Sequence, residues 1–323
     1  ELYPLLLKGD KQALSSAITL IESTHPKARA ESSKLISLCS REKSKSWRIG
    51  ITGVPGVGKS TFIEAFGSHV LDAGHKLAVL AVDPSSNVTG GSILGDKTRM
   101  NTLSQQGNAF IRPTAAAGNL GGVARNSRDA MLLCETAGFD VIFIETVGVG
   151  QSETMVHSMV DYFILLLLAG AGDELQGMKR GIMELADTIL ITKADSGNEK
   201  ASKLAARAYA NAVHLFPSKE SNWITNVLTT SSLEEIGLNE TWDSVQSYFN
   251  SIVSNGFYIK NRRQQNARFL RENLTHLMLN EFDSDDELKA YMSLLETQLT
   301  EGELSPGSAV DLLFEKYKNH LKG

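Results

Sequence analysis

The sequence predicts an α/β fold in which helices cover both faces of a mostly parallel central sheet. Short, nearly continuous apolar runs alternate with helical patterns through most of the chain, and such runs are typical of strands buried on both faces. A glycine-rich loop joins the first run to a helix, and several later runs end in an acidic residue. Because ligands of such sheets bind at the carboxyl ends of the strands, these loops and acids indicate the functional edge.

The glycine-rich loop matches G-x-x-x-x-G-K-[ST], the phosphate-binding pattern of P-loop NTPases. Residues 47–52 are the predicted strand before it, and residues 61–66 begin the predicted helix after it. Lys59 is expected to reach the β- and γ-phosphates, and the Ser60 hydroxyl is expected to bind Mg²⁺. The positive end of the helix favours an anion at the same place. We therefore predict phosphate contacts from Gly53, Val54, Pro55, Gly56, Val57, Gly58, Lys59, Ser60 and Thr61.

Composition and charge are those of an ordinary globular protein. The 323 residues carry a net charge of −5, so electrostatics offers no reason to expect nucleic acid. Cys39 and Cys134 are isolated, which excludes a disulfide framework or a cysteine-rich metal site and suits a reducing compartment. The longest apolar run, residues 162–168, fits a buried strand and is too short to span a bilayer. The chain begins with Glu1 rather than Met, which is compatible with a removed targeting peptide.

Helical patterns flank the predicted sheet and divide the chain into three segments. Residues 1–45 are expected to form an N-terminal helical extension, residues 46–256 the nucleotide-binding domain, and residues 257–323 a C-terminal helical arm. The apolar faces of the arm need either a core of their own or a second subunit, and dimerisation is the expected use. Four arginines in the arm fit a solvated helix face better than a nucleic-acid patch: Arg262, Arg263, Arg268 and Arg271.

Acidic residues near strand ends predict the magnesium site. Asp83 follows an apolar strand, and Glu145 ends the predicted strand 139–145. An acid at this position, with Gly148 three residues on, is typical of a Walker B strand. The carboxylate holds Mg²⁺ directly or through water, and the glycine N–H can bond the γ-phosphate. Asp96 lies in a glycine-rich loop and is either a further member of this site or a solvated loop acid.

The sequence Thr-Lys-Ala-Asp at residues 192–195 follows a further predicted strand and resembles the guanine-specificity motif N-K-x-D. The Asp195 carboxylate is expected to accept from the ring N–H and the exocyclic NH₂ of guanine, donors that adenine does not present. The aliphatic stem of Lys193 is expected to pack on the base plane. Residues 226–232 are the last predicted strand of the core, and its final residues, Thr230, Ser231 and Ser232, can supply backbone contacts to the base edge.

These stretches together resemble the MeaB-type GTPases, also called methylmalonic aciduria type A proteins and formerly described as arginine/ornithine transport kinases. The resemblance runs from end to end and rests on GVPGVGKST, AVDPSS, TGGSILGDKTRM, ETVGVGQSE and GDELQGMKRG. It implies a homodimeric P-loop GTPase that uses GTP/GDP and Mg²⁺. It further implies a G-protein chaperone of adenosylcobalamin-dependent methylmalonyl-CoA mutase, which gates cofactor delivery and protects the mutase from inactivation.

The resemblance also implies roles for individual residues. Catalysis would depend on Lys59, Asp96 and Glu145. The Mg²⁺ site and its surroundings would consist of Ser60, Asp83, Asp96 and Glu145. The guanine would be held by Lys193, Asp195, Ser231, Ser232 and Leu233. Switches I, II and III would lie near residues 84–108, 146–157 and 170–179.

Two residues depart from the general pattern of such sites. Thr192 stands where the guanine motif has Asn, which puts the contact that braces the phosphate loop in question. No Gln directly follows Gly148, so Gln151 is not assigned as the residue that positions water. The glycine-rich residues 170–179 are either a moving segment or a flexible surface loop.

Three other interpretations stay open at this point. A transport-associated ATPase or kinase for basic amino acids is disfavoured by Asp195, which selects GTP. A nickel-delivery GTPase would need a Cys/His cluster near the switches, and the sequence has none. A nucleotide-locked scaffold would bind without turnover. Because no arginine finger is evident, we expect slow hydrolysis that a partner stimulates. The expected location is the cytoplasm, or the mitochondrial matrix for a eukaryotic source.

Overall fold

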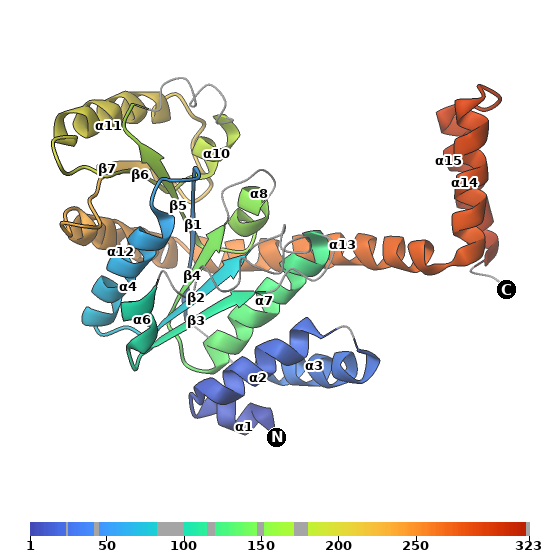
Figure 1. Cartoon of the computed structure of the whole chain (residues 1–323), viewed down its shortest axis with the longest axis horizontal. Coiled ribbons are helices and arrows are strands. Elements are labelled where there is room, and N and C mark those ends of the chain that lie inside the picture. The colour runs from blue at the N-terminus through green and yellow to red at the C-terminus, as the bar shows by residue number, and fades with distance from the viewer. Residues whose placement is uncertain are drawn as a thin grey trace. The chain divides into compact units, whose positions relative to one another are not determined.

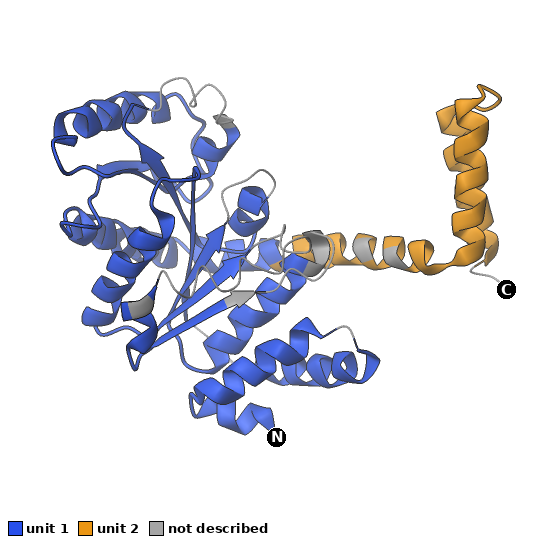
Figure 2. Ribbon diagram, viewed as in Figure 1, with its two compact units in different colours: residues 1–265 blue, residues 266–323 orange. Residues whose placement is uncertain are grey.

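The chain forms two compact units, residues 1–265 and residues 266–323 (Figure 2). The division falls within one helix, α13 (Phe257–Ser284). The segment boundaries at 45/46 and 256/257 that the sequence indicates stay a prediction. The structure is a computed structural model, and it describes residues 1–23, 25–41, 45–82, 100–114, 120–146, 152–170 and 180–320.

Parallel strands form the central sheet of the first unit (Figure 1). They are β1 (Trp47–Gly53), β2 (Leu77–Val82), β3 (Ala109–Thr114), β4 (Val141–Thr146), β5 (Tyr162–Leu168), β6 (Thr188–Thr192) and β7 (Asn226–Thr229). Their order is β3-β2-β4-β1-β5-β6-β7, and every pairing between them is parallel. The predicted α/β fold class is therefore confirmed, with β1 at the centre between β4 and β5.

Helices cover both faces of this sheet. They are α1 (Leu2–Leu7), α2 (Lys11–Glu22), α3 (Pro26–Cys39), α4 (Lys59–Asp72), α6 (Asn101–Gln105), α7 (Leu120–Thr136), α8 (Ser152–His157), α10 (Arg180–Leu185), α11 (Glu199–Val213) and α12 (Leu238–Ser254). Successive strand residues enter opposite cores: Ala78 and Leu80 face α2 and α7, whereas Leu77 and Val79 face α4 and α12. This alternation follows from the period of two in a strand.

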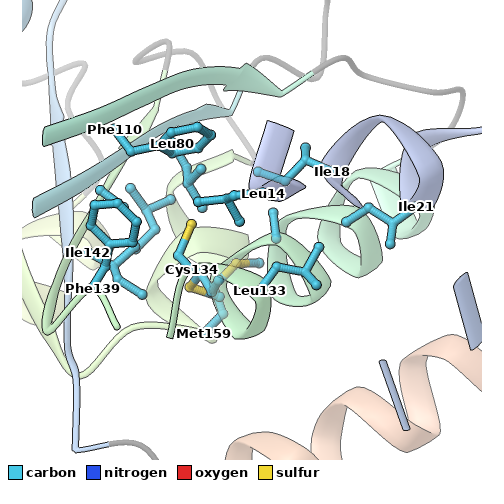
Figure 3. Packing of buried hydrophobic residues seen from close by; sticks show 14 of the residues in the cluster. Leu14, Ile18, Ile21, Leu80, Phe110, Leu133, Cys134, Phe139, Ile142 and Met159 are labelled. Atoms are coloured by element: carbon cyan, nitrogen blue, oxygen red, sulfur yellow. The ribbon is translucent and has the colours of Figure 1, made fainter. Parts of the chain in front are cut away.

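The N-terminal helices pack on the nucleotide core. Leu14, Ile18 and Ile21 form one stripe of α2, and Figure 3 shows them beside Leu133 and Cys134 of α7. Three- and four-residue spacing places side chains on one helix face, so the stripe can be buried as a unit. Polar contacts add to this packing, because Lys11 Nζ on α2 donates to the Ala109 carbonyl of edge strand β3 at 2.6 Å.

The second unit consists of the C-terminal part of α13 and a hairpin of two further helices. Helices α14 (Asp286–Thr300) and α15 (Pro306–His320) bury Leu288, Leu295 and Tyr317 between them. Asp285 caps α14, since its Oδ1 accepts from Leu288 N at 2.8 Å. Among the helices that the structure describes, none is long and apolar enough to cross a membrane.

The arginines of α13 do not share one environment. Arg263, Arg268 and Arg271 are exposed, as a solvated helix face requires. The expectation is wrong for Arg262, whose side chain is 18% exposed and pairs with Asp161. The helical pattern alone could not show this, because the pairing residue comes from a distant part of the chain.

Candidate nucleotide site

The phosphate loop has the backbone that its glycines permit. Gly56 and Gly58 have φ angles of 76° and 95°, in the left-handed region that L-residues with a Cβ rarely adopt. Gly53 is needed for a different reason: a Cβ there would lie 2.6 Å from the Leu166 carbonyl oxygen of β5. The loop thus turns tightly from the centre of the sheet into α4, whose first N–H groups form an anion site.

Lys59 spans this loop from the first turn of α4. Its Nζ donates to the Gly53 carbonyl at 2.9 Å, so the ammonium joins the start of α4 to the end of β1. Ser60 follows it in the same turn and is partly exposed, as is Val54, while Pro55, Gly56 and Thr61 are exposed. The charge and the helix terminus together favour a polyphosphate at this position.

The Thr-Lys-Ala-Asp stretch is tied directly to the phosphate loop. The Thr192 side chain is buried, with Oγ1 donating to the Val57 carbonyl at 2.9 Å and approaching the Leu167 carbonyl at 3.2 Å. Lys193 Nζ donates to the Gly56 carbonyl at 2.9 Å. The threonine hydroxyl therefore braces the phosphate loop in this chain, although the sequence motif has Asn at the same position.

Asp195 and Ser231 meet at the end of β6. Asp195 is 8% exposed, and its Oδ2 accepts a hydrogen bond from the Ser231 hydroxyl. The Ser231 oxygen in turn accepts from Glu234 N at 3.1 Å, and Ala194 N donates to the Thr230 carbonyl at 3.1 Å. The two candidate base-binding stretches are thus one structural feature. Beside them, Ser232 is partly exposed and the Leu233 side chain is 79% exposed.

Glu145 lies at the same edge of the sheet, next to the phosphate-loop strand. It is 7% exposed and in register with Ile51 of β1 and Ala81 of β2. The following Thr146 hydroxyl donates to Thr52 Oγ1 at 2.7 Å, which links β4 to β1 directly before the loop. The position fits the predicted Walker B acid.

Several predicted site residues lie outside the described residues. They are residues 83–99 of the predicted switch I region, with Asp83 and Asp96, residues 147–151 of switch II, with Gly148 and Gln151, and residues 171–179 of switch III. One contact of the site was not anticipated: Asn198 Nδ2 donates to the Lys193 carbonyl at 2.9 Å and so ties residues 192–195, called the base loop below, to the turn that follows them. The sequence Ser-Gly-Asn directly after Asp195 could have predicted this contact, since Asn side chains in turns often hydrogen bond nearby backbone groups.

Comparison with known proteins agrees with this geometry. Residues 14–287 match the family model described as methylmalonyl Co-A mutase-associated GTPase MeaB. A putative GTPase of Caulobacter vibrioides is 48% identical over 312 residues, 97% of this chain and 95% of the relative. The GTPase ArgK of Escherichia coli is 44% identical over 310 residues, 96% of this chain and 94% of the relative.

More distant relatives cover nearly the whole chain as well. The mitochondrial methylmalonic aciduria type A homolog of Mus musculus is 41% identical over 328 residues, 98% of this chain and 79% of the relative. The crystal structure of an LAO/AO transport system kinase matches with a TM-score of 0.81 and 36% identity, covering 98% of this chain and 97% of the other. With its phosphate loop, base loop and Walker B strand assembled at one edge, this chain belongs to the MeaB family of P-loop GTPases.

Proposed function

We propose that this GTPase is a nucleotide-controlled chaperone of an adenosylcobalamin-dependent methylmalonyl-CoA mutase or a related B12-dependent acyl-CoA mutase. It gates delivery of the cofactor and protects the mutase from inactivation. The observation that carries the proposal is the family match over residues 14–287, whose description names the mutase. The names of two relatives, methylmalonic aciduria type A homologs, support a partner in methylmalonyl-CoA metabolism. The proposed location is the cytoplasm, or the mitochondrial matrix for a eukaryotic source.

The phosphate loop binds the triphosphate, and the base loop selects guanine. On binding, the Lys59 ammonium exchanges the Gly53 carbonyl, now at 2.9 Å, for β- and γ-phosphate oxygens. Asp195 accepts from the two guanine donors, while Ser231, Ser232 and Leu233 line the base edge. Such a site rejects adenine because its buried carboxylate would then lack donors.

The residues at the sheet edge fit Mg²⁺. The Ser60 hydroxyl and the buried Glu145 carboxylate are hard oxygen donors, and Mg²⁺ in nucleotide sites takes only one or two carboxylates alongside phosphates and water. Asp83 and Asp96 are the further candidates. When bound, Mg²⁺ neutralises charge on the phosphates. Hydrolysis then depends on positioning by Lys59 and Glu145, without a covalent intermediate.

A homodimer is the proposed assembly. In α13, Leu270, Leu274, Leu277 and Met278 are 69%, 56%, 52% and 46% exposed, and their spacing places them on one helix face. An apolar stripe of this kind favours a second copy of the arm. Replacing Leu277 with Asp is expected to lower the mass measured by light scattering toward that of a monomer. The matched control is Leu204→Asp on α11, a single leucine that is 70% exposed.

One experiment separates this function from its alternatives. GTP and ATP turnover is measured with and without excess methylmalonyl-CoA mutase, using Lys59→Ala as the inactive control. The proposal expects GTP selectivity and stimulation by the mutase. Equal use of ATP and GTP would instead favour a transport-associated ATPase or kinase. Binding without turnover would favour a nucleotide-locked scaffold. A nickel-delivery role has little support, since both cysteines, Cys39 and Cys134, are buried.

A further inference from the structure

We propose that Arg128 and Gln265 form a relay that couples α8, the helix after strand β4, to α13, the helix that continues into the C-terminal unit. Its consequence is that the bound nucleotide changes the local stability of α13 around Gln265. The inference rests on the proposed function, because it takes the β4 edge as the place where the γ-phosphate is sensed. The contacts themselves lie at the amino end of the strands, in the turn before β5.

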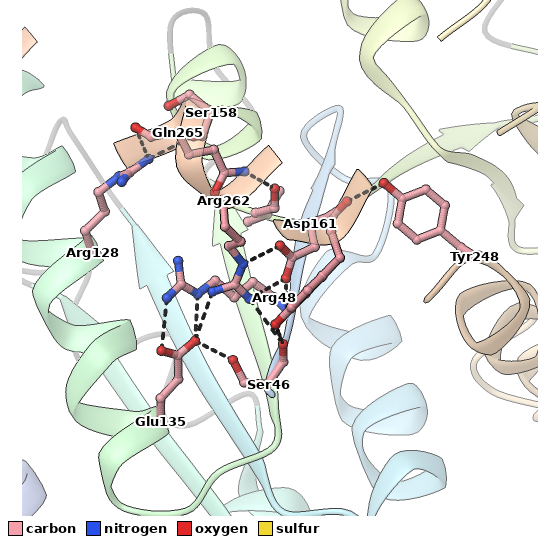
Figure 4. Close-up of polar contacts among 11 residues, drawn as sticks. Ser46, Arg48, Arg128, Glu135, Ser158, Asp161, Tyr248, Arg262 and Gln265 are labelled. Carbon is pink, nitrogen blue, oxygen red and sulfur yellow. Dashed lines mark hydrogen bonds and ion pairs between the residues drawn. The ribbon is translucent and has the colours of Figure 1, made fainter. Parts of the chain in front are cut away.

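Buried ion pairs hold the start of α13 to the sheet. Arg262 Nε and Nη2 each donate to the Asp161 carboxylate at 2.6 Å, and Nη1 lies 3.3 Å from Glu135 Oε1. Arg48 of β1 donates to the same Glu135 carboxylate at 2.8 and 3.0 Å (Figure 4). Burial alone would raise the pKa of Glu135, but the two arginines and Ser46 outweigh burial and lower the pKa to about 2. This part of α13 is therefore a fixed point on β1 and α7.

Hydrogen bonds to backbone carbonyls connect the next turn of α13 to the residues after α8. Arg128 Nη2 on α7 donates to the Ser158 carbonyl at 3.0 Å and to the Gln265 carbonyl at 3.2 Å. Gln265 Nε2 donates to the Val160 carbonyl at 2.6 Å, and the Gln265 side chain is buried. Figure 4 shows Arg128 reaching Ser158 and Gln265 together. One guanidinium and one amide thus join the residues after α8 to the backbone and side chain of α13.

The position of α8 explains why this contact can carry a signal. Glu145 and Thr146 end β4 at its carboxyl end, beside the nucleotide site, and α8, which begins at Ser152, is the next element that the structure describes after this strand. Met155 and Val156 bury the apolar face of α8 against the sheet. A nucleotide-dependent shift of α8 as a body therefore displaces Ser158, the residue directly after it, whereas Asp161 stays held to β1 by its hydrogen bonds with the Arg48 backbone.

The hydrogen bonds leave α13 two responses to such a shift. An N–H···O contact near 3.0 Å ceases to be a hydrogen bond beyond about 3.5 Å. A displacement of about 1 Å at Ser158 must therefore either draw the Gln265 turn along or break these bonds, and the partly buried Ser158 and Gln265 carbonyls would then lose their Arg128 donor. Arg262 and Gln265 are three residues apart and share a helix face. The ion pairs at Arg262 act as a pivot, and Gln265 is the point that moves.

Hydrogen exchange in the full-length protein tests the relay. Amide exchange of residues 258–270 is compared with GDP and with a non-hydrolysable GTP analogue bound. In the wild type we expect exchange rates in this segment to differ by about 5-fold or more between the two nucleotides. Arg128→Met should reduce the difference to less than about 2-fold while leaving the Kd for both nucleotides unchanged. Arg125→Met is the matched control: its guanidinium is 48% exposed and lies 3.9 Å from Asp129, and its exchange difference should equal that of the wild type.

A second variant keeps the test decisive if Arg128→Met fails to fold. Gln265→Met removes the donor to Val160 and should reduce the nucleotide-dependent difference in the same direction. Equal exchange with GDP and the GTP analogue in the wild type would overturn the relay. An exchange difference as large as that of the wild type in either variant would also overturn it. Nucleotide binding is measured in the same samples: an absence of guanine-nucleotide binding refutes the proposed function, whereas normal binding without an exchange difference refutes only the relay.

Discussion

Thr192 offers the sharpest test of how the base loop supports the phosphate loop. Its hydroxyl donates at 2.9 Å to the Val57 carbonyl and lies 3.2 Å from the Leu167 carbonyl, in a site where the side chain is 4% exposed. Thr192→Val keeps the volume and removes the hydroxyl. Val57 belongs to the phosphate loop, so the substitution should loosen the cradle without touching a nucleotide-binding group.

The magnitude follows from the buried carbonyl groups. Leaving such a group without its donor costs about 1–3 kcal/mol. If about 1.4 kcal/mol of this cost is lost from the free energy of nucleotide binding, the Kd for GTP and GDP rises about 10-fold. The Kd is measured by titration with a fluorescent guanine nucleotide, and stability by urea unfolding with nucleotide absent. Thr192→Ser keeps the hydroxyl and should bind within about 3-fold of the wild type.

Thr188 supplies the matched control on the same strand. Its hydroxyl is buried at the amino end of β6, where it hydrogen bonds Tyr162 and lies 3.2 Å from Ser244 Oγ. Thr188→Val should lower the free energy of unfolding by a similar amount, about 1–3 kcal/mol, with an unchanged Kd. If Thr192→Val binds guanine nucleotides as tightly as the wild type, or if Thr188→Val weakens binding equally, the bracing role assigned to Thr192 is wrong.

Three further predictions concern specificity and pH. Asp195→Asn should lower GTP use by about 10⁴-fold and favour xanthosine triphosphate, measured by competition; unchanged GTP selectivity would contradict the base assignment. Glu135 has a pKa lowered from 4.5 to about 2. Its contribution to the free energy of unfolding, ~3 kcal/mol, is therefore present above pH 4.5 and lost as the pH falls toward 2. In Glu135→Gln, the free energy of unfolding measured in urea should therefore change less between pH 4.5 and pH 2 than in the wild type. The same pH dependence in both proteins would refute the ion-pair account. Burial raises the pKa of Asp129 from 3.8 to about 6, although Arg125 and Arg128 lower it. The free energy of unfolding therefore falls as the pH rises from about 4 to 6, and Asp129→Asn should raise it by ~1–3 kcal/mol at pH 7. A lower free energy of unfolding in this variant would show that the two arginines stabilise the carboxylate.

Some features of this protein depend on local sequence alone. The phosphate loop needs left-handed backbone at Gly56 and Gly58, and no residue but glycine adopts it freely. The buried parallel strands need continuous apolar runs, which made the sheet and its functional edge predictable from the chain. Asp10 and Asp285 likewise cap their helices through residues three positions ahead. In each case the interacting groups are near neighbours, so the pattern contains the interaction.

Other features depend on partners that are far apart in the chain. Thr192 braces Val57 across 135 residues, which decided a question that the missing Asn had left open. Arg262 looked like a solvated arginine until the fold placed Asp161 and Glu135 beside it. The links from Arg128 to Ser158 and Gln265 use backbone carbonyls, which every residue possesses and no sequence pattern marks. Local propensity determines which segments become strands and helices, whereas burial and charge pairing between distant segments determine which side chains work together, and those distances exist only in the folded chain.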